Sequence, residues 1–368
     1  MDPTYPAVPV VNLLAAFFAF LSLLTSVRQS WNVGLLMLCL WLLSVTLIDG
    51  VEGLVWSSDS DNKAPVWCDI SSHFDVGVSV GVPACSLAIS RRLYNIVCLR
   101  TMGAQSNREK RNQLLLDLFI GLGFPVLVMG PFYYIVQSYR FEIIEEVGCG
   151  STLIASGLTV VLVNSWPIVF PLISVVFYCP RILWVFYRHH KDVNDFLSSN
   201  ASDVDRTKYF RILAVSCFDI FFTLPTGAVV LLQSLLSQKI PFYPGWNVVH
   251  HPWGPVSISA DEWRSQFWFR FAIIYNQWQY PVLAIVVFAL FGLTGEARAA
   301  YRCWFWTWAG FFGVRPAVGE DVPSMEFGTV DLRDSMSIPA PSTDDDLATM
   351  HSKQENKEHR RVDVRELA

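Results

Sequence analysis

The side chains of this sequence that could do chemistry are ionisable and aromatic groups placed inside long apolar runs. Asp49 and Glu52 lie three residues apart, and Trp56 follows four residues later. Spacings of three and four place all three side chains on one face of a helix. His73 and Asp75 occupy the first part of the next apolar run. Carboxylates grouped in this way point to a ligand pocket of acidic character.

Other polar side chains extend this candidate pocket. Arg270 and Asn276 lie in the last apolar run, and Glu142 and Glu145 lie in the loop before the fifth. Inserting an ionisable group into a membrane costs roughly 2.5–3.5 kcal/mol, so such groups usually face a cavity or a partner. One interpretation is an outward-facing ligand pocket. The other is that Arg270 pairs with an acidic side chain between helices, and the sequence leaves both open.

The sequence contains no residue pattern typical of an enzyme. There is no glycine-rich phosphate loop, no H-E-x-x-H zinc pair and no C-x-x-C pair among the eight cysteines. No set of acid, base and nucleophile can be assembled from it. We therefore expect no catalysis, no cofactor and no metal site, and nothing in the sequence suggests a nucleic acid partner.

The composition indicates a membrane protein with several spans. The chain is 52% hydrophobic and only 16% charged, whereas soluble domains carry about 25% charged residues. Its long apolar runs have the length of membrane-spanning helices. Seven spans are predicted: Val8–Val27, Val33–Trp56, Cys68–Val97, Gln113–Gln137, Gly157–Tyr178, Ile212–Leu236 and Gln266–Leu293. The expected fold is an all-α integral membrane protein with a seven-helix bundle.

Basic residues orient the bundle. The loops after the first, third and fifth spans are rich in Lys and Arg, and the loops after the second, fourth and sixth have few. By the positive-inside rule, the N-terminus is outside and the C-terminus is cytoplasmic. Seven spans satisfy this alternation, whereas six or eight would break it. In this orientation Cys68 and Cys149 are the two cysteines on the outer face, where oxidising conditions favour a bridge over free thiols.

The bundle is expected to occupy residues 1–293, followed by two cytoplasmic parts. Residues 294–313 mix charges with many aromatics, which indicates an amphipathic helix in the membrane interface, in contact with lipids. Cys303 is placed there either for palmitoylation or as a buried small side chain. Residues 314–368 are polar and rich in Pro, Ser and Asp, which is typical of a disordered tail.

Several ordered motifs resemble the fungal mating-pheromone receptors of the a-factor-receptor type, which are class D G-protein-coupled receptors. They are WCDI (67–70), PACSLAISRRL (83–93), DLFIGLGFPVLVMGPFYYIVQSYRFEIIEEVGC (117–149), KYFRILAVSCFDI (208–220) and FGLTGEARAAYR (291–302). The resemblance covers about residues 12–302. It implies a plasma-membrane receptor for a prenylated peptide pheromone, coupled through a heterotrimeric G protein to a mating MAP kinase cascade. A homodimer is a further arrangement that the sequence allows.

The resemblance also assigns roles to particular residues. Cys68 and Cys149 match the outer disulfide positions, and Arg91 and Arg92 stand where the third span reaches the G protein. The ligand contacts are not fixed by motif. Lys208 and Arg211 match the basic entry to the sixth span. The basic inner face is either a docking site for the G protein or a consequence of membrane topology alone, and it consists of Arg91, Arg92, Arg181, Arg188, Lys208 and Arg211.

Other classes of membrane protein fit less well. A small-molecule or ion transporter is the main alternative, but it usually carries an internal repeat, and none is visible. A channel would need a polar stripe along a span. No predicted span contains a lysine, which excludes a retinal Schiff base.

Overall fold

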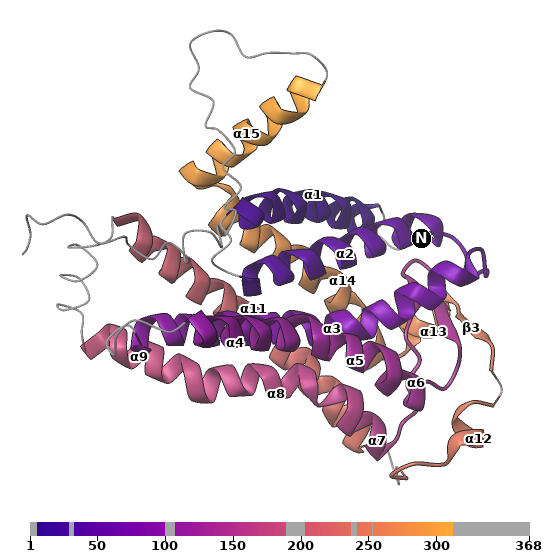
Figure 1. The fold of residues 1–368 in the computed structure, drawn as a ribbon. Helices are drawn as coiled ribbons and strands as arrows, with labels where there is room; N and C mark the ends of the chain where they lie inside the picture. The colour runs from indigo at the N-terminus through magenta and orange to yellow at the C-terminus, as the bar shows by residue number, and fades with distance from the viewer. Residues whose placement is uncertain are drawn as a thin grey trace, which may run out of the picture. The chain divides into compact units, whose positions relative to one another are not determined.

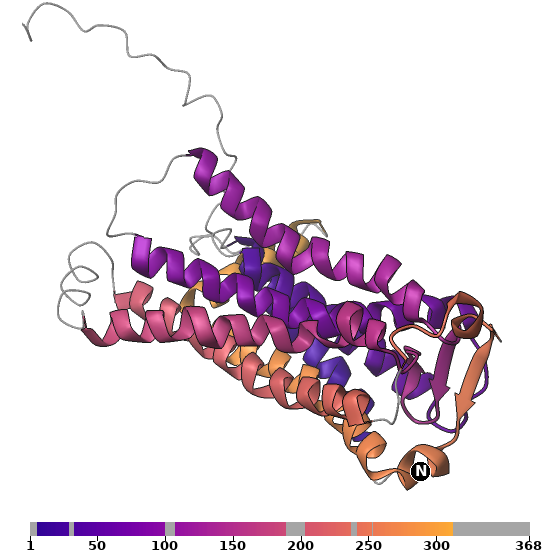
Figure 2. The same ribbon diagram turned by 90° about the horizontal axis from the view of Figure 1, so that it is seen from below.

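The computed structural model describes residues 6–28, 33–99, 107–188, 203–236, 241–251 and 253–311. They form long helices that run side by side, with short strands gathered at one end (Figures 1 and 2). All of them belong to one unit of the chain, Met1–Pro323. The predicted tail, 314–368, lies outside the described residues.

The first three helices agree with the first three predicted spans. They are α1 (Ala7–Arg28), α2 (Val33–Val55) and α3 (Pro65–Leu99). Uninterrupted helix suits these apolar sequences because it bonds every backbone polar group within the segment, which a membrane requires.

The fourth predicted span is a helix with two local widenings. It consists of α4 (Asn107–Leu118), η2 (Phe119–Gly123), α5 (Phe124–Leu127), η3 (Val128–Phe132) and α6 (Tyr133–Val136). The segments η2 and η3 are π-helical. Pro125 is the second residue after η2, and Pro131 lies inside η3. A proline cannot donate to the carbonyl four residues earlier, and a π-helical turn accommodates that loss.

The fifth predicted span is bent. It consists of α7 (Gly157–Thr159), η4 (Val160–Asn164), α8 (Trp166–Ile173), η5 (Ser174–Tyr178) and α9 (Cys179–Arg188). Its two parts, Gly157–Asn164 and Trp166–Ile182, meet at an angle of 48°. The bend lies beside Pro167, the second residue of α8, and proline is a common cause of helix kinks.

Three more long helices follow in the described chain. They are α11 (Asp203–Leu236), α14 (Phe267–Val287) with its π-helical end η6 (Phe288–Gly292), and α15 (Gly295–Phe311). In the described residues, five helices are long and apolar enough to cross a membrane, and the bent fifth segment makes six. The apolar part of α11, Leu213–Val229, is shorter than the others.

Helix α3 is the centre of the bundle. In its membrane-spanning part, 78% of the residues are buried, against 22–56% in the other four continuous spans. One side of α3 packs against α1, α2 and α14, through residues such as Val82 and Ile89. Its other side packs against the fourth and fifth segments, through Val80 and Ala84. The middle of α3 is therefore packed on both sides by most of the bundle.

The loops at one end of the bundle contain a small sheet, so the expectation of an all-α protein is incomplete. Strand β1 (Phe141–Ile144) pairs antiparallel with β2 (Gly148–Gly150) and parallel with β3 (Pro255–Ile258), in the order β2-β1-β3. Two short helices, α12 (Trp246–Val249) and α13 (Ala260–Ser265), flank β3. The sheet joins the loop before the fifth span to the loop before the seventh.

Candidate functional site

The sheet is tied to the bundle by the predicted disulfide. Cys68 at the start of α3 and Cys149 of β2 are bonded, with their Cα atoms 5.2 Å apart. Cys68 is fully buried and packs with Trp56, Phe141 and Ile143 in a small apolar cluster under the sheet. The bridge and the cluster together hold the sheet over the ends of α2 and α3.

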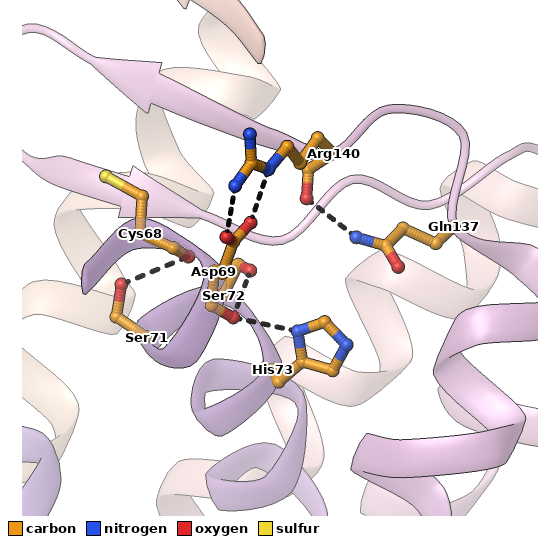
Figure 3. Close-up of polar contacts among 7 residues, drawn as sticks. All are labelled: Cys68, Asp69, Ser71, Ser72, His73, Gln137 and Arg140. Atoms are coloured by element: carbon orange, nitrogen blue, oxygen red, sulfur yellow. Dashed lines mark hydrogen bonds and ion pairs between the residues drawn. The ribbon is translucent and has the colours of Figure 1, made fainter. Parts of the chain in front are cut away.

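A second tie between α3 and the outer loop is an ion pair that the sequence did not point to. Arg140 donates from Nε to Oδ1 of Asp69 at 2.8 Å and from Nη2 to Oδ2 at 2.5 Å (Figure 3). The Arg140 carbonyl accepts from the side chain of Gln137 at 2.6 Å, and Nδ1 of His73 contacts the Asp69 carbonyl at 2.8 Å. Arg140 is a basic residue in a loop that belongs to the set with few basic residues. This exception to the alternation of basic loops was the signal in the sequence that Arg140 has a specific partner.

Glu52 anchors the end of α2 to both neighbouring elements. Its Oε1 accepts from Nε1 of Trp67 at 2.7 Å, and its Oε2 accepts from the backbone N–H of Cys149 at 3.0 Å. Gly148 allows this approach: its φ is +127°, and a Cβ there would lie 2.5 Å from Glu52. Both carboxylate oxygens of Glu52 are therefore engaged within the protein.

Three other predicted carboxylates lie near Glu52 and have no basic partner among the described residues. Asp75 interacts electrostatically with Asp49, with Glu52 and with Glu142. Asp75 is exposed and accepts one hydrogen bond, from Ser151 at 2.7 Å. Asp49 and Glu142 are half-buried, and neither carboxylate has a hydrogen-bond partner among the residues that the structure describes. These four carboxylates form what we call the outer acidic cluster: Asp49, Glu52, Asp75 and Glu142.

The electrostatics of the cluster are unfavourable without a ligand. Burial, with a further contribution from the negative charge of Asp75, raises the pKa of Glu142 to about 7. Like charges held near one another disfavour ionisation, and a cation placed among them relieves the repulsion. The arrangement can bind a positively charged group.

The remaining predicted ligand residues fall into two sets. Three make contacts within the protein: Trp56 is buried and donates to the Asp61 carbonyl, Glu145 accepts from the N–H of Ala260 at the start of α13, and His73 packs edge-on against Tyr133. Two side chains, Arg270 and Asn276 of α14, are exposed. No described acidic side chain pairs with Arg270, so the structure gives no support to the interhelical pairing that the sequence left open.

At the opposite end of the bundle, Arg91 has an internal partner. Its Nη1 donates to Oδ1 of Asp117 in α4 at 2.5 Å, and both side chains are largely buried, at 15% and 6% exposure. Arg92 lies near enough to interact with the same carboxylate. Asp117 is an acidic residue inside a predicted span, and such residues usually have a charged partner. This was the signal in the sequence that Asp117 could pair with Arg91 or Arg92.

The other basic residues predicted for this end are only partly described. Arg181 is exposed, with its guanidinium 5.9 Å from the ring centre of Tyr94, and Arg211 is half-buried. Arg188 and Lys208 lie on α9 and α11, but their side chains are outside the described part of the chain. Cys303 is buried in α15, at 3% exposure, which is the environment of a packed side chain.

The chain resembles known receptors over most of its length. The family described as "Pheromone A receptor" matches residues 7–313. The pheromone B alpha 2 receptor of Schizophyllum commune is 34% identical over 88% of this chain and 49% of its own length. Pheromone receptor 1 of Mycosarcoma maydis is 32% identical over 78% of this chain and 80% of its own length.

The pheromone a factor receptor of Saccharomyces cerevisiae is 30% identical over 73% of this chain and 55% of its own length. Against the Schizophyllum relatives, the chain spans about half of their length. These relatives are receptors and not enzymes. The match of the family to the whole helical part of the chain, together with relatives above 30% identity, shows that the chain belongs to the pheromone A receptor family.

Proposed function

We propose that this chain is a plasma-membrane receptor for a prenylated peptide pheromone and that it signals through a heterotrimeric G protein to a mating MAP kinase cascade. The family membership supports the receptor activity. The observation that carries the ligand assignment is the outer acidic cluster, in which Asp49, Asp75 and Glu142 have no basic partner among the described residues.

The proposed topology has seven spans, with the outer acidic cluster on the extracellular side. The alternation of basic loops supports this orientation. The disulfide at the same end supports it further, because disulfides persist in oxidising compartments. In this topology α11 is the sixth span.

The cluster is proposed to bind a cationic group of the peptide. Asp75 is its exposed member, and it is held by Ser151 alone, so it can accept further hydrogen bonds from an ammonium or guanidinium group. Arg270 and Asn276 are exposed on α14 and are proposed to contact the peptide elsewhere. The prenyl chain is proposed to insert between spans or into the bilayer.

The test is binding of prenylated peptides to the receptor in reconstituted membranes, with G-protein nucleotide exchange as the second readout. Pairs of peptides that differ only in one Lys or Arg replaced by Gln isolate the charge. We expect wild type to prefer one cationic peptide by about tenfold, the scale of a charge-assisted hydrogen bond. Asp75→Asn should remove that preference.

Asp61→Asn is the matched control, since Asp61 is an exposed acidic residue of the neighbouring outer loop. It makes the same change of charge and should keep the preference. If Asp75→Asn and Asp49→Asn both bind every peptide as wild type does, the ligand site lies elsewhere. If no peptide binds and none stimulates nucleotide exchange, the receptor assignment itself fails.

The G protein is proposed to dock at the opposite end of the bundle, next to Arg92 and Arg181. The basic residues there would receive an acidic or amphipathic segment of its α subunit. Because Arg91 pairs with Asp117, we assign Arg91 a positioning role and give the direct contact to Arg92. Arg188, Lys208 and Arg211 are proposed to extend the same face.

A further inference from the structure

A set of buried polar side chains lies between α3 and α11, apart from the outer acidic cluster. Asp219 of α11 is fully buried, and neither of its carboxylate oxygens has a hydrogen bond of regular geometry within the described part of the chain. The hydroxyls of Ser86 and Ser90 on α3 and of Ser216 on α11 are also buried and unpartnered. Since buried polar groups are almost always hydrogen-bonded, four such side chains require an explanation.

Two of these side chains, Asp219 and Ser86, face each other across the helices. The Ser86 hydroxyl of α3 lies within hydrogen-bonding range of the Asp219 carboxylate, although the two make no hydrogen bond of regular geometry. Tyr280 of α14 is close enough to Asp219 for electrostatic interaction. Helices α3 and α11 run in opposite directions (Figure 1). Ser90 is one turn beyond Ser86, and Ser216 is one turn before Asp219, so the two pairs lie at adjacent levels. The oxygen atoms of Asp219 and Ser86 therefore meet in the interior, and buried hydroxyls stand one turn away on each helix.

The charge of Asp219 is not balanced by the protein. Among the described residues, no basic side chain pairs with Asp219, and the predicted spans contain no lysine. A buried charge is strongly unfavourable unless it is paired or neutralised. One carboxylate is neutralised by one monovalent cation, whereas a divalent ion would leave a net positive charge in the same apolar surroundings.

The ligand atoms also limit the kind of ion. The available donors are carboxylate and hydroxyl oxygens, which suit hard cations rather than transition metals. Within the described ranges, no group of three His, Cys, Asp or Glu side chains could hold a metal ion. Na⁺ is small enough to be held by a few short side chains.

We propose that Asp219, together with Ser86 and Ser216, binds a Na⁺ ion between α3 and α11. The ion stabilises the packing of these two helices. Ser90 lies one helical turn from Ser86 and adds its buried hydroxyl to the polar surroundings of the ion. The site is independent of the pheromone site, because its residues lie on other turns of the bundle.

The test is thermal unfolding of the purified full-length receptor in NaCl, KCl and choline chloride at one pH and one ionic strength. An ion that binds only the folded state makes the melting temperature depend on its concentration. We expect a rise of about 2 °C for each tenfold increase in Na⁺ above its dissociation constant, and none with choline. Asp219→Asn should abolish the Na⁺ response, and Ser86→Ala should weaken it.

Ser22→Ala is the matched control. Ser22 is a buried serine of α1 whose hydroxyl already donates to the Phe18 carbonyl, so this variant should keep the Na⁺ response. Equal melting temperatures in the three salts, or a Na⁺ response retained in Asp219→Asn, would overturn the proposal. A stability that depends on pH without preference for any cation would assign a proton to Asp219 and would also overturn it. If Asp219→Asn does not fold, Ser216→Ala and the wild-type salt series decide the question.

Discussion

At the scale of single residues, the carboxylates of the outer acidic cluster have different tasks although their charge is the same. Glu52 holds Trp67 and the backbone of Cys149, so its negative charge is used inside the protein. Within the described ranges, Asp75 accepts a hydrogen bond from Ser151 alone, and the Glu142 carboxylate accepts none. Hydrogen bonds to a carboxylate stabilise its charged form, and their absence leaves it ready to accept a ligand.

Glu142 should make the stability of the receptor depend on pH. Its pKa rises from 4.5 to about 7 on folding, because of burial and of the charge on Asp75. Between these values the folded state keeps a proton that the unfolded chain has released. The free energy of unfolding should therefore fall as pH rises from 4.5 to 7, by about 1–3 kcal/mol, and then level off.

Thermal unfolding of wild type and of Glu142→Gln between pH 4 and 8 measures this contribution as a difference. The variant should lack it and have the flatter profile. Parallel profiles for the two proteins would show that Glu142 does not titrate in this range.

Gly148 should be needed for the contact between Glu52 and β2. Gly148→Ala meets two obstacles: a left-handed backbone and a Cβ 2.5 Å from Glu52. Gly245→Ala is the matched control, with φ +100° and nothing within 4 Å of its Cβ. We expect a loss of about 1–2 kcal/mol for the control and about 1–3 kcal/mol more for Gly148→Ala, measured by thermal unfolding. Equal losses would mean that the approach to Glu52 is not tight.

At the scale of elements, α3 connects the two ends at which the receptor is proposed to act. Its beginning carries the disulfide and the Asp69–Arg140 pair, and its far end is held to α4 by Arg91 and Asp117. Both sides of the helix are packed between these points. A conformational change at one end of α3 can therefore reach the other end in two ways. Either α3 moves as a rigid body, or α4 moves relative to α3.

The Arg91–Asp117 pair should be structural. Arg91→Ala leaves a buried carboxylate that only Arg92 can compensate, and we expect a loss of about 3 kcal/mol. The double variant Arg91→Ala/Asp117→Ala should lose less than the sum of the two single variants. A thermal-unfolding cycle measures this coupling; additive losses would contradict the pair.

Arg92→Ala separates the structural role from signalling. It should leave the melting temperature nearly unchanged and reduce pheromone-stimulated nucleotide exchange at equal surface expression. Unchanged exchange in this variant would remove Arg92 from the G-protein face.

At the scale of the whole molecule, the receptor consists of a helical bundle closed at one end by a sheet. The disulfide joins residues 81 positions apart and links that sheet to the central helix. The β1–β3 pairing brings in a loop more than 100 residues further along the chain. Three outer segments are therefore fixed relative to one another before any ligand is bound.

Loss of the disulfide should release the sheet. Cys149→Ser should lower the free energy of unfolding by about 2–5 kcal/mol and weaken peptide binding. Cys217→Ser is the control, since Cys217 is an exposed thiol outside the bridge. Dithiothreitol should destabilise wild type but not Cys149→Ser. If both respond alike to reduction, the bridge does not carry this stability.

The sequence predicts the helices well and the outer loops poorly. Apolar runs fix the spans because a membrane leaves no other way to satisfy their backbone, so α1 and α2 match within one or two residues. The disulfide followed from orientation alone. The strands have three or four residues, and β1 pairs with β3 across a long separation, so no local pattern indicates them. The contacts of the Glu52 carboxylate could not be predicted either, because they involve Trp67 and Gly148, which belong to two other segments of the chain.

The parallel pairing of β1 with β3 has a consequence for the order in which the receptor is made. Cys68 and Cys149 both precede Pro255 in the chain, so the bridge can form while later segments are still being synthesised. The β1–β2 hairpin can form at the same stage. Strand β3 arrives last, after α11, and completes the sheet. Until then one edge of β1 is unpaired, and an unpaired edge is a site where other chains can attach. The growing chain therefore has a vulnerable edge until residues 255–258 have been made and can pair with β1.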